Sequence, residues 1–209
     1  MARELPRMDT ATAAVIANDF VNERNLRGYF ERRLRSARPW LFGDDTSAFR
    51  AWQIAIRSAL GKGSPGVYLV GSSMFGISLK PLAFGRPFRE VGHSEGPSDV
   101  DIAVVDANLF TVAWNHIVDY SRFARAEIGH GRLPAQIQVV RNGIYWGHVT
   151  PRDVPSSSEI VGRVRTACAA SERELSGHPA TARIYRRFTD LVGYQTDGLS
   201  RTLRGIMRE

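Results

Sequence analysis

The chain of 209 residues has a single cysteine, Cys168, and no apolar stretch long enough to cross a membrane. One cysteine excludes an intrachain disulfide framework, and its scarcity is typical of a reducing compartment. A transmembrane helix needs about 20 mostly apolar residues, so none is expected. The first 20 residues contain acids and no sustained apolar segment, so we do not expect a secretory signal. The sequence therefore predicts a cytoplasmic protein without a membrane partner.

Soft metal ligands are also scarce, and basic residues outnumber acidic ones. The five histidines and the cysteine show no spacing typical of a zinc site, and His148 is only a weak candidate base or phosphate contact. The chain has 28 lysines and arginines against 21 acids, a net charge of +7. This balance favours anionic partners such as nucleotides, RNA, DNA or an acidic protein, although solvated surface arginines explain it equally well.

Phosphate binding is indicated where an apolar run at residues 67–70 ends in the sequence Gly71-Ser72-Ser73. Glycine permits close approach of the backbone to a ligand. The two serine hydroxyls and the exposed amides of such a turn can hold a phosphate group. A short helical turn over 73–79 would add the positive end of its dipole beside the phosphates.

A second apolar run carries two carboxylates, Asp99 and Asp101, two positions apart. Residues two apart on a strand point to the same face, so these side chains are expected to converge while Val100 and Ile102 face the core. Two close carboxylates repel each other unless a cation lies between them or one is protonated. Oxygen ligands of this kind suit Mg²⁺, which binds through one or two carboxylates plus substrate phosphates.

This order of features resembles the DNA polymerase beta-like nucleotidyltransferase superfamily, and in particular its small minimal members of toxin–antitoxin and antiviral-defence systems. The family signature is an apolar strand, Gly-Ser, a helical turn and a strand with Asp-x-Asp. Here it is Gly71-Ser72 followed by SDVDI at residues 98–102. The resemblance implies that Ser72 contacts the triphosphate of an NTP such as ATP. It also implies that Asp99 and Asp101 hold Mg²⁺ or Mn²⁺ as catalytic ligands.

The spacer between the two halves of the signature is roughly twice the usual length for the family. Residues 80–97 are rich in proline and glycine, so the sequence predicts an irregular loop. Lys80, Arg86 and Arg89 make this loop basic, and one interpretation is that they contact phosphates or an acceptor. The alternative is a solvated surface excursion. Long loops in compact domains are often functional, which favours the first interpretation slightly.

The family's third carboxylate, which helps to bind metal and acts as a base, has no counterpart in the predicted strand at residues 135–140. That strand offers Gln136 and Gln138, and glutamine cannot act as a base near neutral pH. Two functions therefore stay open. The first is transfer of a nucleoside monophosphate from an NTP to an acceptor hydroxyl of RNA, a nucleotide, a small molecule or a protein. The second is a catalytically silent fold that binds a nucleotide, RNA or a cognate partner protein.

The expected fold class is α/β (α+β): a small mixed sheet of the nucleotidyltransferase type, flanked by helices and followed by a C-terminal helical region. We expect a core with N-terminal helices over 1–150 and a helical region over 151–209 packed on it. The apolar spacing predicts helices over 10–35, 46–60, 108–127, 158–175 and 180–207, and strands over 67–70, 98–105, 135–141 and 144–149.

Overall fold

The computed structural model describes residues 6–36, 38–61, 63, 65–128, 143 and 145–207, without the side chains of 123–128. Seven α-helices lie within these residues: α1 (Thr10–Asn22), α2 (Leu26–Arg35), α3 (Thr46–Leu60), α4 (Ser72–Phe75), α5 (Ala107–Ile128), α7 (Glu159–Glu174) and α8 (Phe188–Ile206). Four strands accompany them: β1 (Gly66–Val70), β2 (Val100–Val105), β3 (His148–Val149) and β4 (Ala180–Tyr185). Three short 3-10 helices are η1 (Trp40–Phe42), η2 (Pro81–Ala83) and η3 (Pro151–Asp153).

The four strands form one mixed sheet in the order β1-β2-β4-β3. β2 pairs antiparallel with β1 and parallel with β4, and β4 pairs antiparallel with β3. The chain between the parallel strands contains α5 and α7, because parallel neighbours need a long crossover. The predicted mixed α/β class is confirmed, and the sheet contains strands from both sides of residue 150.

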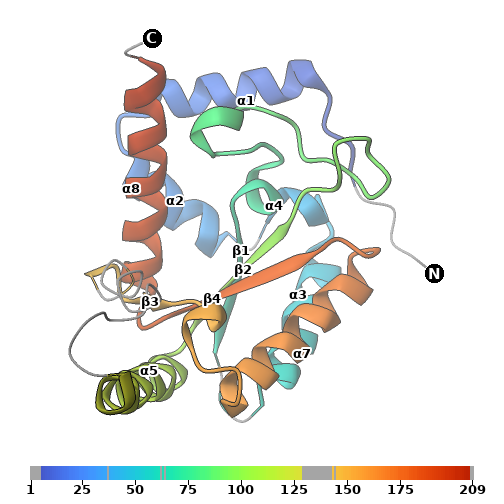
Figure 1. Ribbon diagram of the computed structural model, residues 1–209. Coiled ribbons are helices and arrows are strands. Elements are labelled where there is room, and N and C mark those ends of the chain that lie inside the picture. The colour runs from blue at the N-terminus through green and yellow to red at the C-terminus, as the bar shows by residue number, and fades with distance from the viewer. Residues whose placement is uncertain are drawn as a thin grey trace.

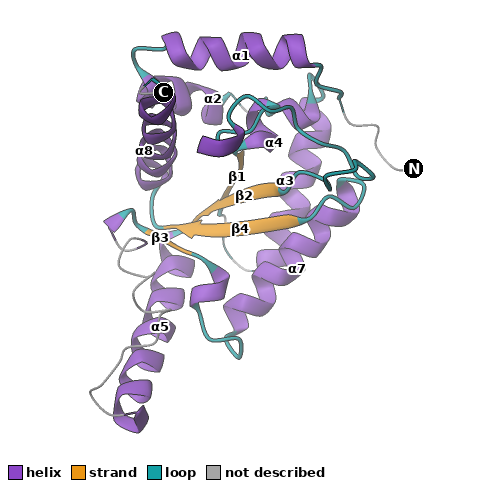
Figure 2. Ribbon diagram, turned by 45° about the horizontal axis from the view of Figure 1, so that its top comes forward, coloured by secondary structure: helices purple, strands orange, loops and turns teal. Residues whose placement is uncertain are grey.

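Helices cover both faces of this sheet. Figures 1 and 2 show α3 and α7 together on one face and α2, α4 and α8 on the other. On β2, Val100, Ile102 and Val104 join the apolar cluster of α3 and α7. Ala103 faces the opposite cluster, where α8 contributes Leu191 and Leu199. The alternation of side chains along a strand therefore turns Asp101 toward the α8 face.

The N-terminal segment contains two helices where the spacing predicts a single one over 10–35. Asp9 begins α1 by accepting a hydrogen bond from the Thr12 amide at 2.8 Å. The chain then leaves the helix after Asn22, and Asn25 begins α2 by accepting from the Gly28 amide at 2.9 Å. The single-helix prediction was wrong because a capping asparagine inside an apolar repeat starts a new helix.

The prediction of one helix over 180–207 was wrong in its first part. Residues 180–185 form β4, which lies inside the sheet between β2 and β3, and α8 begins only at Phe188. The local sequence ATARIY alternates, with Ala182 and Ile184 buried in the α3–α7 cluster. Ile184 and Phe188 also fit a helical repeat, so the local sequence alone allows either conformation. Hydrogen bonding to β2 on one side and β3 on the other decides for the strand.

The other predictions have mixed outcomes. The helix predicted over 46–60 is confirmed as α3, and those over 108–127 and 158–175 agree with α5 and α7 to within one residue at each end. Of the strand predicted over 144–149, residues 145–149 are described, and only His148–Val149 form a strand. The strand predicted over 135–141, with Gln136 and Gln138, lies outside the described residues. None of the described helices has the length and apolar character required to cross a membrane.

Candidate functional site

A cavity of about 1490 Å³ opens where β1 ends and β2 begins, between the loop over 78–99 and helix α8. Its lining includes Gly71, Ser72, Asp99 and Asp101 from the two halves of the sequence motif. Ligand pockets have volumes of about 300–1,000 Å³. The cavity therefore has room for a nucleotide and for part of a second molecule.

Gly71 and Asp101 bring the two halves of the motif into contact. Gly71 has φ of 61°, a backbone conformation that residues other than glycine rarely adopt. A Cβ atom at this position would lie 2.9 Å from Asp101 Oδ2. Glycine is therefore required at this position for two reasons: the turn needs its backbone conformation, and the Asp101 carboxylate occupies the space of a side chain.

The two serines of the turn have different environments. Ser72 begins α4 and lines the cavity. The Met74 and Phe75 amides donate to the Gly71 carbonyl, so only the amides of Ser72 and Ser73 have no partner within the helix. Ser73 is fully buried, and its hydroxyl donates a hydrogen bond to the Val70 carbonyl at 2.8 Å. The structure does not place the Ser73 hydroxyl in the cavity, because the first turn of α4 directs it toward the strand. The helix is also shorter than the turn predicted over 73–79.

Asp99 and Asp101 both line the cavity, although only Asp101 belongs to β2. Asp99 precedes the strand and is exposed, whereas Asp101 is half-buried and accepts a hydrogen bond from Thr181 Oγ1 at 2.9 Å. Burial raises the pKa of Asp101 above its usual value, and the nearby carboxylate of Asp99 adds to the rise. Thr181 and the charges of Arg183 and Lys80 oppose it. A divalent cation would relieve the cost of ionising this carboxylate.

The three basic residues predicted from the loop all reach the cavity. Lys80 and Arg86 are exposed in its lining. Arg89 also lines it, but its guanidinium is 2.7 Å from the Glu95 carboxylate. Lys80 and Arg86 make no ion pair within the described residues, so these two are the loop cations that can meet an anionic ligand.

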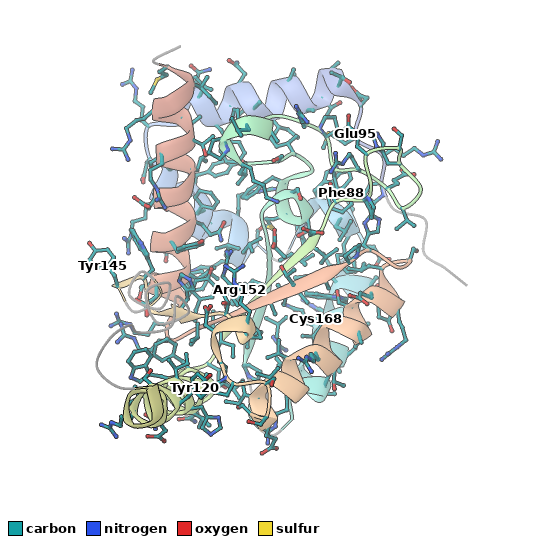
Figure 3. The ribbon with its side chains drawn as sticks, viewed as in Figure 1. Phe88, Glu95, Tyr120, Tyr145, Arg152 and Cys168 are labelled. Carbon is teal, nitrogen blue, oxygen red and sulfur yellow. The ribbon has the colours of Figure 1, made fainter. Side chains whose placement is uncertain are left out.

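The loop is more structured than its composition predicts. Ile77 and Pro87 form an isolated β-bridge, η2 supplies one helical turn, and Ser98 Oγ accepts a hydrogen bond from the Arg89 amide at 3.0 Å. Figure 3 shows Phe88 nearer the sheet than Glu95, and Phe88 is buried against Trp40 with ring centroids 5.4 Å apart. The loop is therefore anchored as a wall of the cavity.

Sequence reasoning missed the residues of β4. Thr181 lies opposite Asp101 in the parallel pair, and Arg183, two residues further along, faces the same side. Arg183 lines the cavity with Tyr194 and Gln195 of α8. The alternating sequence ATARIY was the signal that could have identified this strand. The strand beside the two acids thus offers a hydroxyl and a guanidinium and no carboxylate.

Other acids do not complete a larger metal site. Glu90 and Glu95 line the cavity, but each forms an ion pair with an arginine. Asp153 and Glu159 lie outside the lining. No group of three or more histidines, cysteines or acids able to hold a metal occurs among the described residues.

The oxygen donors of Asp99 and Asp101 fit one hard divalent cation. Mg²⁺ commonly binds through one or two carboxylates and completes its coordination with water and substrate phosphates. The two acids lie in one cavity, and Asp101 is held beside the Gly71 turn where a phosphate would enter. The donor set therefore suits a cation that arrives with a phosphorylated ligand.

His148 lies outside the cavity lining, although the sequence offered it as a weak candidate. Its ring packs against Tyr194 with centroids 4.6 Å apart, and its Nδ1 atom is buried without a hydrogen-bond partner. Burial, followed by the charge of Arg183, lowers the pKa of His148 to about 4. The position indicates a structural residue that stays neutral near pH 7.

We compared the chain with protein-family models, with curated proteins and with solved structures, and none of them matched. The geometry of the cavity and the motif that lines it therefore carry the functional interpretation.

Proposed function

We propose that the chain is a nucleotidyltransferase that binds an NTP with Mg²⁺ or Mn²⁺ in the cavity and transfers a nucleoside monophosphate to an acceptor hydroxyl. The observation that carries this proposal is the close approach of the Asp101 carboxylate to Gly71, which leaves no space for a Cβ atom, in a cavity that Ser72 and Asp99 also line. A glycine-serine turn suited to phosphate, beside one carboxylate and in the same cavity as a second, supports nucleotidyl transfer.

Each residue has a separate role in this proposal. Asp99 and Asp101 hold the divalent cation, and the Ser72 hydroxyl with the first amides of α4 receives the phosphates. Lys80 and Arg86 lie in the lining and would neutralise charge on the leaving pyrophosphate. The bound cation would supply charge neutralisation at the α-phosphate and lower the pKa of the acceptor hydroxyl.

The reaction itself balances without a protein base. The acceptor oxygen forms a bond to the α-phosphorus as the bond from that phosphorus to the oxygen of the β-phosphate breaks. Pyrophosphate leaves, and the hydroxyl proton passes to solvent water. The cavity volume of about 1490 Å³ supports an acceptor that enters beside the nucleotide, whether RNA, a nucleotide, a small molecule or a protein side chain.

A second candidate function is nucleotide, RNA or partner binding without transfer. Thr181 and Arg183 favour it, because the strand next to Asp101 offers no carboxylate that could serve as a base. This alternative keeps the same cavity and the same cation.

Incubation with each of the four α-labelled NTPs, Mg²⁺ or Mn²⁺, and total RNA separates the two functions, with the chain itself as the other acceptor. Labelled product from the wild type, lost in Asp101→Asn and retained in Asp119→Asn, would support transfer. Asp119 is an exposed acid of α5 outside the cavity, so it controls for loss of charge. Nucleotide binding without product would favour the silent fold. Neither nucleotide binding nor product would contradict transfer and the nucleotide-binding form of the alternative.

A further inference from the structure

Arg183 is a half-buried cation that lines the cavity from β4. Its guanidinium carbon lies 5.1 Å from the centre of the Tyr194 ring, so the aromatic face supports it from the α8 side. Within the described part of the chain Arg183 forms no ion pair, whereas Arg89, another arginine of the lining, is 2.7 Å from Glu95. A half-buried guanidinium without a carboxylate partner suits an anionic ligand.

The position of Arg183 relative to the acids follows from the register of the parallel strands. Asp101 lies opposite Thr181, and Ala103 lies opposite Arg183. Side chains two residues apart share a face, so Arg183 and Thr181 both flank the side of the sheet that carries Asp101. The charge of Arg183 and the carboxylate of Asp101 act on each other, although they form no direct ion pair.

Tyr185 further restricts the position of the Arg183 side chain. This residue is fully buried on the same face of β4, and its hydroxyl makes no hydrogen bond of standard geometry although Arg183 and Gln195 lie close to it. Tyr194 and Tyr185 together thus limit where the guanidinium can lie. A planar, restrained guanidinium can contact two phosphate oxygens at once.

From this arrangement we infer that Arg183 binds the phosphates of the nucleotide and takes the place of a second divalent cation, so that the site loads one metal ion per chain. The inference rests on the proposed nucleotide function. Among the acids of the described lining, Asp99 and Asp101 make no ion pair, whereas Glu90 and Glu95 are paired with arginines. A second divalent cation would therefore have no carboxylate of its own, and it would lie near the positive charge of Arg183.

The test counts bound Mn²⁺ by electron paramagnetic resonance in the presence of α,β-methylene-ATP, which cannot be cleaved at the α-phosphate. The wild type is expected to bind one Mn²⁺ per chain. Arg183→Gln is expected to weaken binding of the analogue about 10- to 100-fold, since hydrogen bonds to charged groups contribute about 1.5–3 kcal/mol. Arg183→Asp is expected to admit a second Mn²⁺, because it adds a carboxylate to the same cavity.

Arg50→Gln is the matched control. Arg50 is exposed on α3 and lies outside the cavity lining, so its loss should change neither the metal count nor the affinity. If Arg183→Gln fails to fold, Arg183→Lys replaces it. Lysine keeps the charge but lacks the planar fork, and we expect it to bind the analogue about three- to tenfold more weakly.

Two Mn²⁺ ions on the wild type, or an unchanged affinity for the analogue in Arg183→Gln or its substitute Arg183→Lys, would overturn the inference. The proposed function would survive either result if Asp101→Asn still abolished product formation. Failure of the wild type to bind the analogue with Mn²⁺ would overturn both. One Mn²⁺ together with the expected loss in the Arg183 variant would support the inference, whether or not transfer occurs.

Discussion

The two faces of the sheet differ in what they bury. Against α3 and α7 the strands present aliphatic side chains only, such as Ile102 and Ile184, and the cluster there is continuous. Against α8 the same strands present Asp101, Thr181 and Arg183 at the end that opens into the cavity. One face therefore stabilises the fold, and the other combines a smaller core with a polar site. Substitutions on the two faces should accordingly separate stability from ligand binding.

The largest effect on stability is expected on the α3–α7 face, from Trp52→Ala. Trp52 is almost completely buried, and its Nε1 donates a hydrogen bond to Ser171 Oγ at 3.1 Å. Truncation of a buried tryptophan costs about 3–5 kcal/mol of unfolding free energy. Urea unfolding measures the loss, and the folded fraction should still bind nucleotide with wild-type affinity. A large loss of affinity in the folded fraction would contradict the separation of the two faces.

The largest effect on binding is expected on the α8 face, from Gly71→Ala. The new Cβ would lie 2.9 Å from Asp101 Oδ2, and alanine at φ of 61° costs about 1–2 kcal/mol of strain. We expect stability to fall by about that amount and Mn²⁺–nucleotide affinity to fall about 10- to 100-fold, which is the range typical when the surroundings that orient a metal ligand are disturbed. Titration calorimetry measures the affinity. Gly162→Ala is the control, since a Cβ there meets nothing within 4 Å.

Gly71 and Asp101 show what the sequence could predict. Gly71 and Asp101 belong to a local motif, in which glycine for the turn and alternation along the strand place the site without knowledge of the rest of the fold. The helices α3, α5 and α7 were predictable for the same reason, because each shows a regular apolar repeat over many residues.

The parts that could not be predicted depend on pairing between distant segments. β4 is six residues long, and its register with β2 places Thr181 and Arg183 beside Asp101 across 80 residues of sequence. The burial of Ser73 likewise depends on the direction in which α4 leaves β1. The break between α1 and α2 at Asn25 was visible in the sequence as a capping residue, but the apolar repeat outweighed it.

A smaller effect is expected from His148, which packs behind the cavity against Tyr194. The pKa of His148 is about 4 in the folded protein and 6.5 in the unfolded chain. Between these two pH values the unfolded chain therefore binds more protons than the folded protein does, which favours unfolding. Stability should therefore fall across this window, by about 1–2 kcal/mol after allowance for partial exposure. Urea unfolding between pH 7 and 4.5 measures the change.

His148→Phe should remove this part of the acid sensitivity, and His93→Gln, in the exposed loop, should leave it intact. An equal dependence on pH in the wild type and in His148→Phe would show that other groups cause the loss of stability.

The smallest effect is expected from Thr181→Val. It removes the 2.9 Å hydrogen bond to Asp101, which holds the pKa of that carboxylate down against burial. The pKa of Asp101 should rise further, so that a higher pH is needed for metal binding. The lost hydrogen bond corresponds to about 0.5–1.5 kcal/mol, or about a two- to thirteenfold loss of Mn²⁺ affinity at neutral pH. Thr181→Ser should behave as the wild type does, and equal pH profiles for valine and threonine would contradict the assigned contact.

The most direct test is a crystal structure with Mn²⁺ and α,β-methylene-ATP, in which anomalous scattering locates the metal. We predict one anomalous peak at about 2.0–2.2 Å from carboxylate oxygens of both Asp99 and Asp101, with the phosphates over the Gly71–Ser72 turn. No peak at the two carboxylates, together with a guanidinium folded between them, would contradict a metal–nucleotide site in this cavity.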